Sequence, residues 1–186
     1  MNAPHSERTI WLVAGEDSGD QLGAKLMRGL RELSDRPIRF GGVGGEAMAA
    51  EGFASLFPID DVAVMGYLPV AARLRTLLRR IRQSVRDVVE ARPDVLVIID
   101  SPGFTHAVAS RVRKRMPDLP IVDYVSPSVW AWRPWRAAKM RPFIDHVLAL
   151  LPFEPEAATD ALGAFDAHFD ELAHHTARRR LGARRD

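Results

Sequence analysis

The chain has 186 residues and contains no cysteine. Disulfide frameworks, zinc–thiolate sites and cysteine nucleophiles are therefore excluded. It also has no long apolar run: none reaches the roughly 18–20 residues that span a bilayer. Residues 1–8 are polar and lack the apolar core of an export signal. These absences predict a cytoplasmic protein, or one that lies on a membrane surface without crossing it.

A large charge of one sign is missing as well. Lys and Arg number 26 against 24 Asp and Glu, so the formal net charge is only +2, and no nucleic-acid partner is expected. The arginines are unevenly placed, however, because they crowd residues 73–86 and 178–185. Such a local basic face binds anionic lipid or phosphate more readily than the net charge suggests. With 47% hydrophobic residues the chain can bury the core of one domain.

Five short apolar runs recur along the chain, at residues 9–14, 39–43, 95–99, 121–125 and 146–150. Several are nearly continuous Val, Ile and Leu, which is typical of strands buried on both faces of a parallel sheet. Apolar residues at helical spacing lie between them, as Leu22, Leu26, Leu30 and Leu33 do after the first run. The alternation predicts an α/β fold with a doubly wound, mostly parallel sheet.

The composition changes after residue 156. Residues 157–186 are rich in Ala, Asp, His and Arg and contain neither a strand-like run nor a glycine-rich phosphate turn. We therefore expect one Rossmann-like domain over residues 1–156, followed by an atypical polar tail that cannot form a second α/β domain.

The first predicted strand ends in a turn that carries three acids and two glycines, Gly15-Glu16-Asp17-Ser18-Gly19-Asp20. Ligands of open α/β sheets bind at the carboxyl ends of strands. Carboxylates here would repel a pyrophosphate but accept hydrogen bonds from sugar hydroxyls. The alternative is an ordinary turn in which Asp17 or Ser18 caps the following helix.

Asp100 ends the third predicted strand and is followed by Ser101-Pro102-Gly103. A carboxylate at the rim of a cleft, partly shielded from water, suits a general base that deprotonates a sugar hydroxyl. The alternative is a cap of the next helix. His106 is a second candidate base.

Two further segments have unusual composition. Residues 124–135 place three tryptophans within six residues beside two prolines, which favours stacking on sugars, acyl chains or a membrane interface, unless the loop packs on a neighbouring domain. Residues 62–70 are apolar and lead into an Arg/Leu-rich stretch, a pattern typical of a protein that touches an anionic bilayer. An ordinary core helix has the same apolar stripe. We expect membrane contact at Met65, Tyr67, Leu68 and Val70.

Five segments together resemble the lipid A disaccharide synthases in order and spacing. They are residues 13–20, 63–66, 99–102, 124–133 and 151–154, of which the tyrosine-to-tryptophan string is the most specific. The resemblance covers roughly residues 8–156. It implies the amino-terminal half of an inverting glycosyltransferase of the GT-B type.

Such an enzyme transfers 2,3-diacylglucosamine from UDP-2,3-diacylglucosamine to lipid X (2,3-diacylglucosamine 1-phosphate) on the cytoplasmic face of the inner membrane, without a metal or another cofactor. By resemblance Asp100 is the general base. We expect the substrate to be bound by Glu16, Ser18, Gly19, Ser126, Trp130, Trp132 and Arg133. A homodimer is a further expectation.

Two departures from the family pattern bear on these expectations. Gly103 stands where the family usually has an acidic residue, and the second domain that holds UDP does not follow. We therefore expect a truncated chain that is inactive alone. The alternative function is a non-catalytic module that binds acylated sugar phosphates or the membrane surface. A nucleotide-binding oxidoreductase is disfavoured because no Gly-x-Gly-x-x-Gly turn follows a strand.

Overall fold

The computed structural model describes residues 7–63, 67–124 and 139–148, and for residues 67–73 it describes the backbone alone. The strands are β1 (Arg8–Ala14), β2 (Ile38–Val43), β3 (Val95–Ile99), β4 (Ile121–Tyr124) and β5 (His146–Leu148). The helices are α1 (Asp17–Leu33), α2 (Glu46–Ala50), α3 (Tyr67–Ala91) and α4 (Pro102–Arg113), with one 3-10 turn, η1 (Ile59–Asp61).

The five strands form one sheet in the order β2-β1-β3-β4-β5, and every neighbouring pair is parallel. The apolar runs therefore predicted the strands correctly, to within a residue at each boundary that lies in the described part of the chain. β1 and β3 occupy the middle, and Leu12, Val13, Ile98 and Ile99 are fully buried. Burial on both faces explains why their sequences do not alternate between apolar and polar residues.

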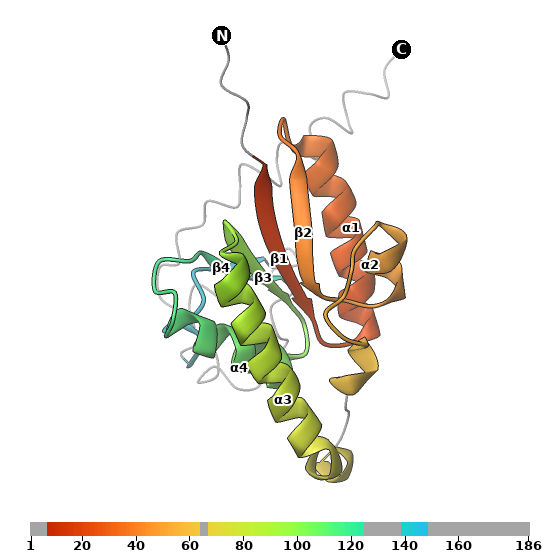
Figure 1. Cartoon of the computed structure of the whole chain (residues 1–186), viewed down its shortest axis with the longest axis vertical. Coiled ribbons are helices and arrows are strands. Elements are labelled where there is room, and N and C mark those ends of the chain that lie inside the picture. Colours follow the sequence, from red (N-terminus) through yellow and green to blue (C-terminus); the bar gives the residue numbers. More distant parts are fainter. Residues whose placement is uncertain (1–6, 64–66, 125–138, 149–186) are drawn as a thin grey trace.

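Helices cover both faces of the sheet. α1 and α2 pack together on one face, and α3 and α4 pack together on the other (Figure 1). This arrangement confirms the doubly wound, mostly parallel fold that the sequence predicts.

α3 shows how the apolar stripe positions a helix. Ile81, Val85 and Val88 are buried against the sheet, whereas Arg82 and Arg86 face solvent. The stripe is not buried along its whole length, because Leu74 is 47% exposed. The interpretation of the stripe as an ordinary core face thus holds for the second half of α3 and not for Leu74.

The strand order places a topological switch point between β1 and β3. The chain leaves β1 for α1 on one face of the sheet and leaves β3 for α4 on the opposite face. The two loops therefore diverge at the carboxyl ends of neighbouring strands, where open α/β sheets bind their ligands.

Candidate functional site

Three polar side chains meet at this switch point. Glu16 and Ser18 follow β1, and Asp100 follows β3. Ser18 Oγ lies 2.8 Å from Glu16 Oε1 and 3.1 Å from Asp100 Oδ2, so one hydroxyl bridges two carboxyl groups that are 84 residues apart in the chain (100 minus 16). The structure thus brings together the candidate base and two of the expected substrate-binding residues.

Glycine at position 15 lets the two loops approach each other this closely. A Cβ on Gly15 would lie 2.5 Å from Ser101 Cβ and 2.6 Å from Ser101 Oγ. These distances are shorter than any normal contact, so a larger residue at this position would separate the β1–α1 loop from the β3–α4 loop. The close packing of Gly15 on Ser101 therefore helps to place Ser18 beside Asp100.

The backbone at the end of β3 is strained. Asp100 and Ser101 have φ values of 53° and 46°, in the left-handed region that residues with a side chain rarely adopt. Each such residue costs about 1–3 kcal/mol and persists only where its surroundings hold it. Here the Thr105 hydroxyl lies 2.7 Å from the Asp100 carbonyl oxygen and 3.0 Å from that of Ser101. The strained turn directs Asp100 toward Ser18 instead of continuing the strand.

Hydrogen bonds hold both oxygens of the Asp100 carboxyl group. The backbone N–H of Ser101 donates to Oδ1 at 2.7 Å, and Oδ2 contacts Ser18. Ser101 occupies the N-cap position of α4, and Glu16 occupies that of α1. Neither side chain makes a capping hydrogen bond with its helix. The alternatives that treated Asp100, Asp17 or Ser18 as helix caps are therefore wrong.

The pKa of Glu16 is raised above its ordinary value of 4.5. The hydrogen bond from Ser18 acts to lower the pKa. Partial burial, a hydrogen bond with Asp100, and the negative charges of Asp100 and Asp17 together outweigh that effect. The negative charge of Asp100 thus disfavours ionisation of Glu16.

A second polar pair lies close to this cluster. Asp123 on β4 is 1% exposed, and its Oδ2 lies 3.2 Å from Nε2 of His106 on α4, whose ring packs edge-on against Phe143. Burial raises the pKa of Asp123; its contact with His106 acts to lower it, and the charge of Asp100 adds to the rise. His106 is thus held by a buried acid, and its role as a second base stays a prediction.

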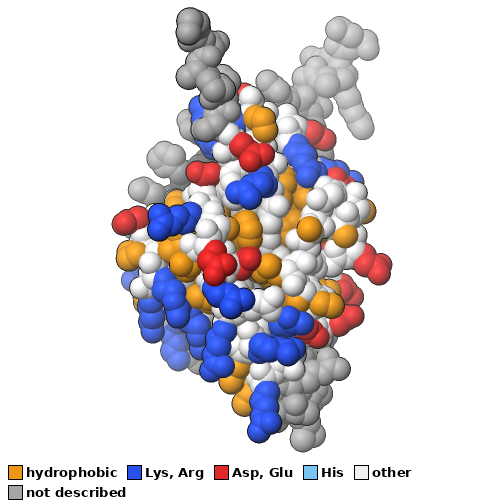
Figure 2. Space-filling view, viewed as in Figure 1, with side chains coloured by type: hydrophobic (Ala, Val, Ile, Leu, Met, Phe, Trp, Pro, Cys, Tyr) orange, Lys and Arg blue, Asp and Glu red, His pale blue; other side chains and the backbone are white. Residues whose placement is uncertain are grey.

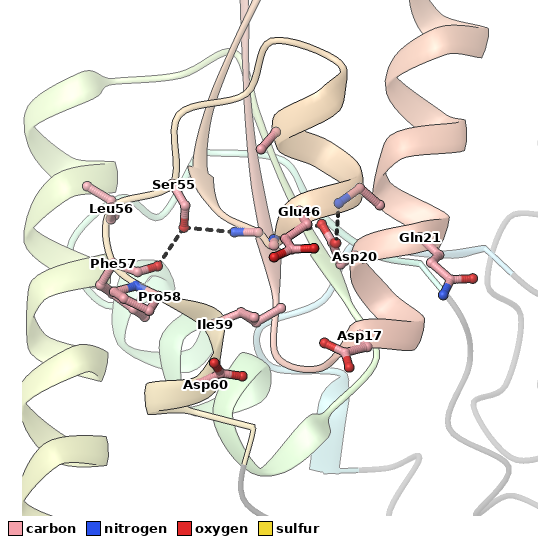
Figure 3. Close-up of a pocket in the computed structure, with 14 residues that line it drawn as sticks. Asp17, Asp20, Gln21, Glu46, Ser55, Leu56, Phe57, Pro58, Ile59 and Asp60 are labelled. Carbon is pink, nitrogen blue, oxygen red and sulfur yellow. Dashed lines mark hydrogen bonds between the residues drawn. The ribbon is translucent and has the colours of Figure 1, made fainter.

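A cavity of about 1170 Å³ opens between the start of α1, the β2–α2 loop and residues 55–60. Asp17, which lies between Glu16 and Ser18 in the chain, lines this cavity, whereas Glu16, Ser18 and Asp100 do not. Leu56, Phe57 and Pro58 form an apolar wall, and Asp17 and Glu46 lie opposite (Figure 3). The loop after β2 contributes the backbone of Gly44 and Gly45 to the lining. The cavity is suited to a ligand with both hydroxyl groups and apolar substituents.

Asp20 holds one wall of this cavity. Its side chain is buried and accepts three backbone N–H groups, from Gly45 at 2.7 Å, Ala47 at 2.8 Å and Met48 at 3.1 Å. Asp20 thereby caps α2 from the neighbouring helix. No local sequence pattern indicates this role, because the three partners lie 25 to 28 residues away.

Several residues expected at the site lie outside the described residues: Met65, Ser126, Trp130, Trp132 and Arg133. Tyr67, Leu68 and Val70 belong to the first turn of α3, where the structure describes no side chains. Gly19 is buried against the end of β3, where an added Cβ would lie 3.1 Å from the Ile99 carbonyl oxygen. Gly19 thus brings α1 close to the sheet, and its role in substrate binding stays a prediction.

Comparison with known proteins gives the site a context. The family model described as lipid-A-disaccharide synthetase (LpxB) matches residues 10–166. The chain belongs to this family. The lipid-A-disaccharide synthase of Nitrobacter hamburgensis is 62% identical over 154 residues, that of Bradyrhizobium diazoefficiens 54% over 156 residues, and that of Rhodospirillum centenum 50% over 146 residues.

These matches cover most of the chain but a minor part of each relative. They span 83%, 84% and 78% of this chain, and 39%, 40% and 36% of the respective relatives. The family member described here therefore corresponds to less than half the length of the synthases that it matches.

A solved structure shares the fold. The UDP-GlcNAc 2-epimerase of Neisseria meningitidis, bound to UDP-GlcNAc, superposes with a TM-score of 0.54 over 83% of this chain and 42% of that chain, at 10% sequence identity. Within the described ranges of the family member, no helix is long and apolar enough to cross a membrane. The same ranges bring together no group of three or more His, Asp or Glu side chains that could hold a metal ion.

Proposed function

We propose that this chain is the acceptor-side half of a lipid A disaccharide synthase, which transfers 2,3-diacylglucosamine from UDP-2,3-diacylglucosamine to lipid X. The observation that carries the proposal is the junction of Asp100 with Ser18 and Glu16 at the topological switch point, beside a cavity with one apolar and one acidic wall. Membership of the synthetase family supports it.

Asp100 acts as the general base in this proposal. Its carboxylate removes the proton from a sugar hydroxyl as the oxygen of that hydroxyl bonds to the anomeric carbon of the donor, and the bond to UDP breaks with its electron pair leaving on the phosphate. The Ser101 N–H and the Ser18 hydroxyl fix both oxygens of Asp100. A base held in this way needs no reorientation when the substrate arrives.

The cavity is proposed to hold the acceptor sugar and the first carbons of its acyl chains. Asp17 and Glu46 accept hydrogen bonds from sugar hydroxyls and disfavour a phosphate group in the same place. Leu56, Phe57 and Pro58 offer the apolar surface against which acyl groups leave water. The 1-phosphate of lipid X would therefore point out of the cavity.

A chimera tests the proposal directly. Residues 1–156 are joined to the remaining part of the Nitrobacter hamburgensis synthase, whose matching segment is 62% identical. We expect the chimera to form disaccharide from UDP-2,3-diacylglucosamine and lipid X, and the 186-residue chain alone to form none, because transfer requires both substrates side by side. Formation of disaccharide by the chain alone would contradict the second expectation.

Asp100→Asn in the chimera should lower kcat by about 10²–10⁴, the usual range for loss of a general base. The matched control is Asp118→Asn, an exposed aspartate between α4 and β4 at the opposite end of the sheet, which should leave kcat unchanged. If Asp100→Asn turns over like the parent chimera, Asp100 is not the base.

We also propose that the chain lies on the cytoplasmic face of the inner membrane. Lys and Arg side chains gather around α3 (Figure 2), and those of α3 that are described and exposed are Arg75, Arg79, Arg82 and Arg86. Each arginine near an anionic leaflet contributes about 1 kcal/mol. The exposed side chain of Leu74 and the apolar sequence of residues 65–70 would add insertion to this charge attraction.

Sedimentation with anionic vesicles separates the two contributions. High salt screens the charges and leaves the apolar term, so some binding should persist, and Leu68→Glu should weaken it. Leu33→Glu is the control, because Leu33 is 64% exposed at the end of α1. Complete loss of binding at high salt, or an equal effect of both variants, would exclude insertion. The expected homodimer stays a prediction that analytical ultracentrifugation checks.

A further inference from the structure

The Ser18 hydroxyl bridges Glu16 and Asp100 but has only one hydrogen to donate to the two carboxyl groups. Ser18 has one hydroxyl hydrogen, yet its oxygen lies within hydrogen-bond distance of both carboxyl groups, at 2.8 Å and 3.1 Å. If both acids are ionised, Ser18 can donate to only one of them, and its lone pairs then face the other carboxylate. A proton on one of the two acids would give each of the two contacts a donor of its own.

The surroundings indicate which acid carries it. Asp100 Oδ1 accepts the Ser101 N–H and Oδ2 faces Ser18, so donors are available to both oxygens of an ionised Asp100. Glu16 lies beside two other acids, Asp17 and Asp100, whose charges together with partial burial raise its pKa. Behind Asp100, the buried Asp123 pairs with His106. Because Asp100 has two such donors, these contacts favour Glu16 as the acid that carries the shared proton.

We propose that Glu16 and Asp100 share one proton through the Ser18 hydroxyl, and that this chain of three groups is the path by which the proton leaves Asp100 during catalysis. At rest Glu16 donates to Ser18 Oγ, and Ser18 donates to the Asp100 carboxylate. After Asp100 has taken the proton of the sugar hydroxyl, Glu16 first releases its own proton to solvent; Asp100 then passes a proton to Ser18 Oγ as Ser18 passes its hydroxyl proton to Glu16. One proton enters and one leaves, so the three groups return to their starting count. The origin of the proton in a sugar hydroxyl rests on the proposed function. The sharing of one proton between Glu16 and Asp100 does not depend on it.

Carboxyl-carbon NMR titration of the 186-residue chain tests the sharing. In the parent chain Glu16 should titrate above its ordinary value of 4.5. Asp100→Asn removes both the charge and the partner, so the Glu16 pKa should fall back toward that value. Asp17→Asn is the matched control, because Asp17 contributes the smallest of the effects on Glu16, and its shift should be smaller.

Ser18→Ala distinguishes a shared proton from simple repulsion between charges. With the bridge removed, Asp100→Asn should change the Glu16 pKa much less than it does in the parent chain. If the effect of Asp100→Asn is the same with and without Ser18, or if Glu16 titrates at its ordinary value, sharing through Ser18 is refuted.

Kinetics of the chimera test the path. Glu16→Gln and Ser18→Ala should each lower kcat roughly tenfold or more, and the double variant should lose no more than either single one, because groups that act as a unit are not additive. Additive losses, or losses confined to KM, would show independent roles in binding and overturn the path. An inactive parent chimera would refute the proposed function and leave the titration result standing.

Discussion

Replacement of Asp20 by asparagine tests how the wall of the cavity is held. The two side chains have nearly the same shape, but the amide offers one acceptor oxygen and no charge. Oδ1 of Asp20 accepts the N–H groups of Gly45 and Met48, so an asparagine oxygen in that place can keep both. Oδ2 accepts the N–H of Ala47, which would then face an amide NH2 group. The change therefore removes one bond and weakens two.

The expected size follows from these contacts. A hydrogen bond to a charged group contributes about 1.5–3 kcal/mol, so Asp20→Asn should lower the free energy of unfolding by about 2–3 kcal/mol. Asp20→Ala removes all three bonds. Because contributions that share one carboxylate are not additive, and because water from the cavity can reach two of the N–H groups, we expect about 3–5 kcal/mol. That is a large part of the roughly 5–15 kcal/mol that stabilises a typical domain.

Urea denaturation followed by far-ultraviolet circular dichroism measures these values. The matched control is Asp17→Asn, which alters an exposed acid in the same turn of α1 that lines the same cavity and should change the free energy of unfolding much less. Hydrogen exchange at Ala47 and Met48 should become faster in the Asp20 variants, because α2 loses its cap. Asp20→Asn with the stability of the parent, or with unchanged exchange in α2, would refute this account of the cavity wall.

Two further predictions concern the close packing of Gly15 and the buried acid Asp123. Gly15→Ala should destabilise the chain by about 1–3 kcal/mol through overlap with Ser101. The control is Gly29→Ala, which should be neutral or stabilise α1 because an added Cβ there meets nothing within 4 Å. Equal effects of the two variants on the free energy of unfolding would argue against close packing of the loops. Burial raises the pKa of Asp123 above 3.8, so the folded state holds this proton more tightly and the Asp123 contribution to stability decreases as pH rises from about 4 through the raised pKa. Asp123→Asn should remove that decrease, and parallel stability curves for the two proteins across this pH range would contradict the burial argument.

Much of the fold could be predicted from local sequence because local physical rules determine it. Strands buried on both faces require nearly continuous apolar residues, and residues 95–99 match β3 without an error at either end. The helical stripe of α3 follows from its periodicity in the same way. The strand order did not follow from these patterns, since many orders can bury the same five strands.

The candidate site was predicted in part. The rule that ligands gather at the carboxyl ends of strands directed attention to Glu16, Ser18 and Asp100 before any geometry was known. The alternatives that made Asp17, Ser18 or Asp100 helix caps were wrong, because Glu16 and Ser101 occupy the N-cap positions. A side chain near a helix start has both local and distant partners, and Ser18 makes its contacts with Glu16 and with Asp100 from another strand.

The sequence by itself determined the α/β class, the limits of the strands and the family to which the chain belongs, because periodicity and motif spacing are properties of neighbouring residues. The tertiary structure alone decided that β3 lies beside β1, and this pairing places Asp100 next to Ser18 across 82 residues. It also decided that Asp20 caps α2, that Asp123 holds His106, and that Gly15 lies against Ser101. The physical reason is the same in each case: the free energy of a buried charge or a close contact depends on groups that the chain brings together only when the sheet has formed.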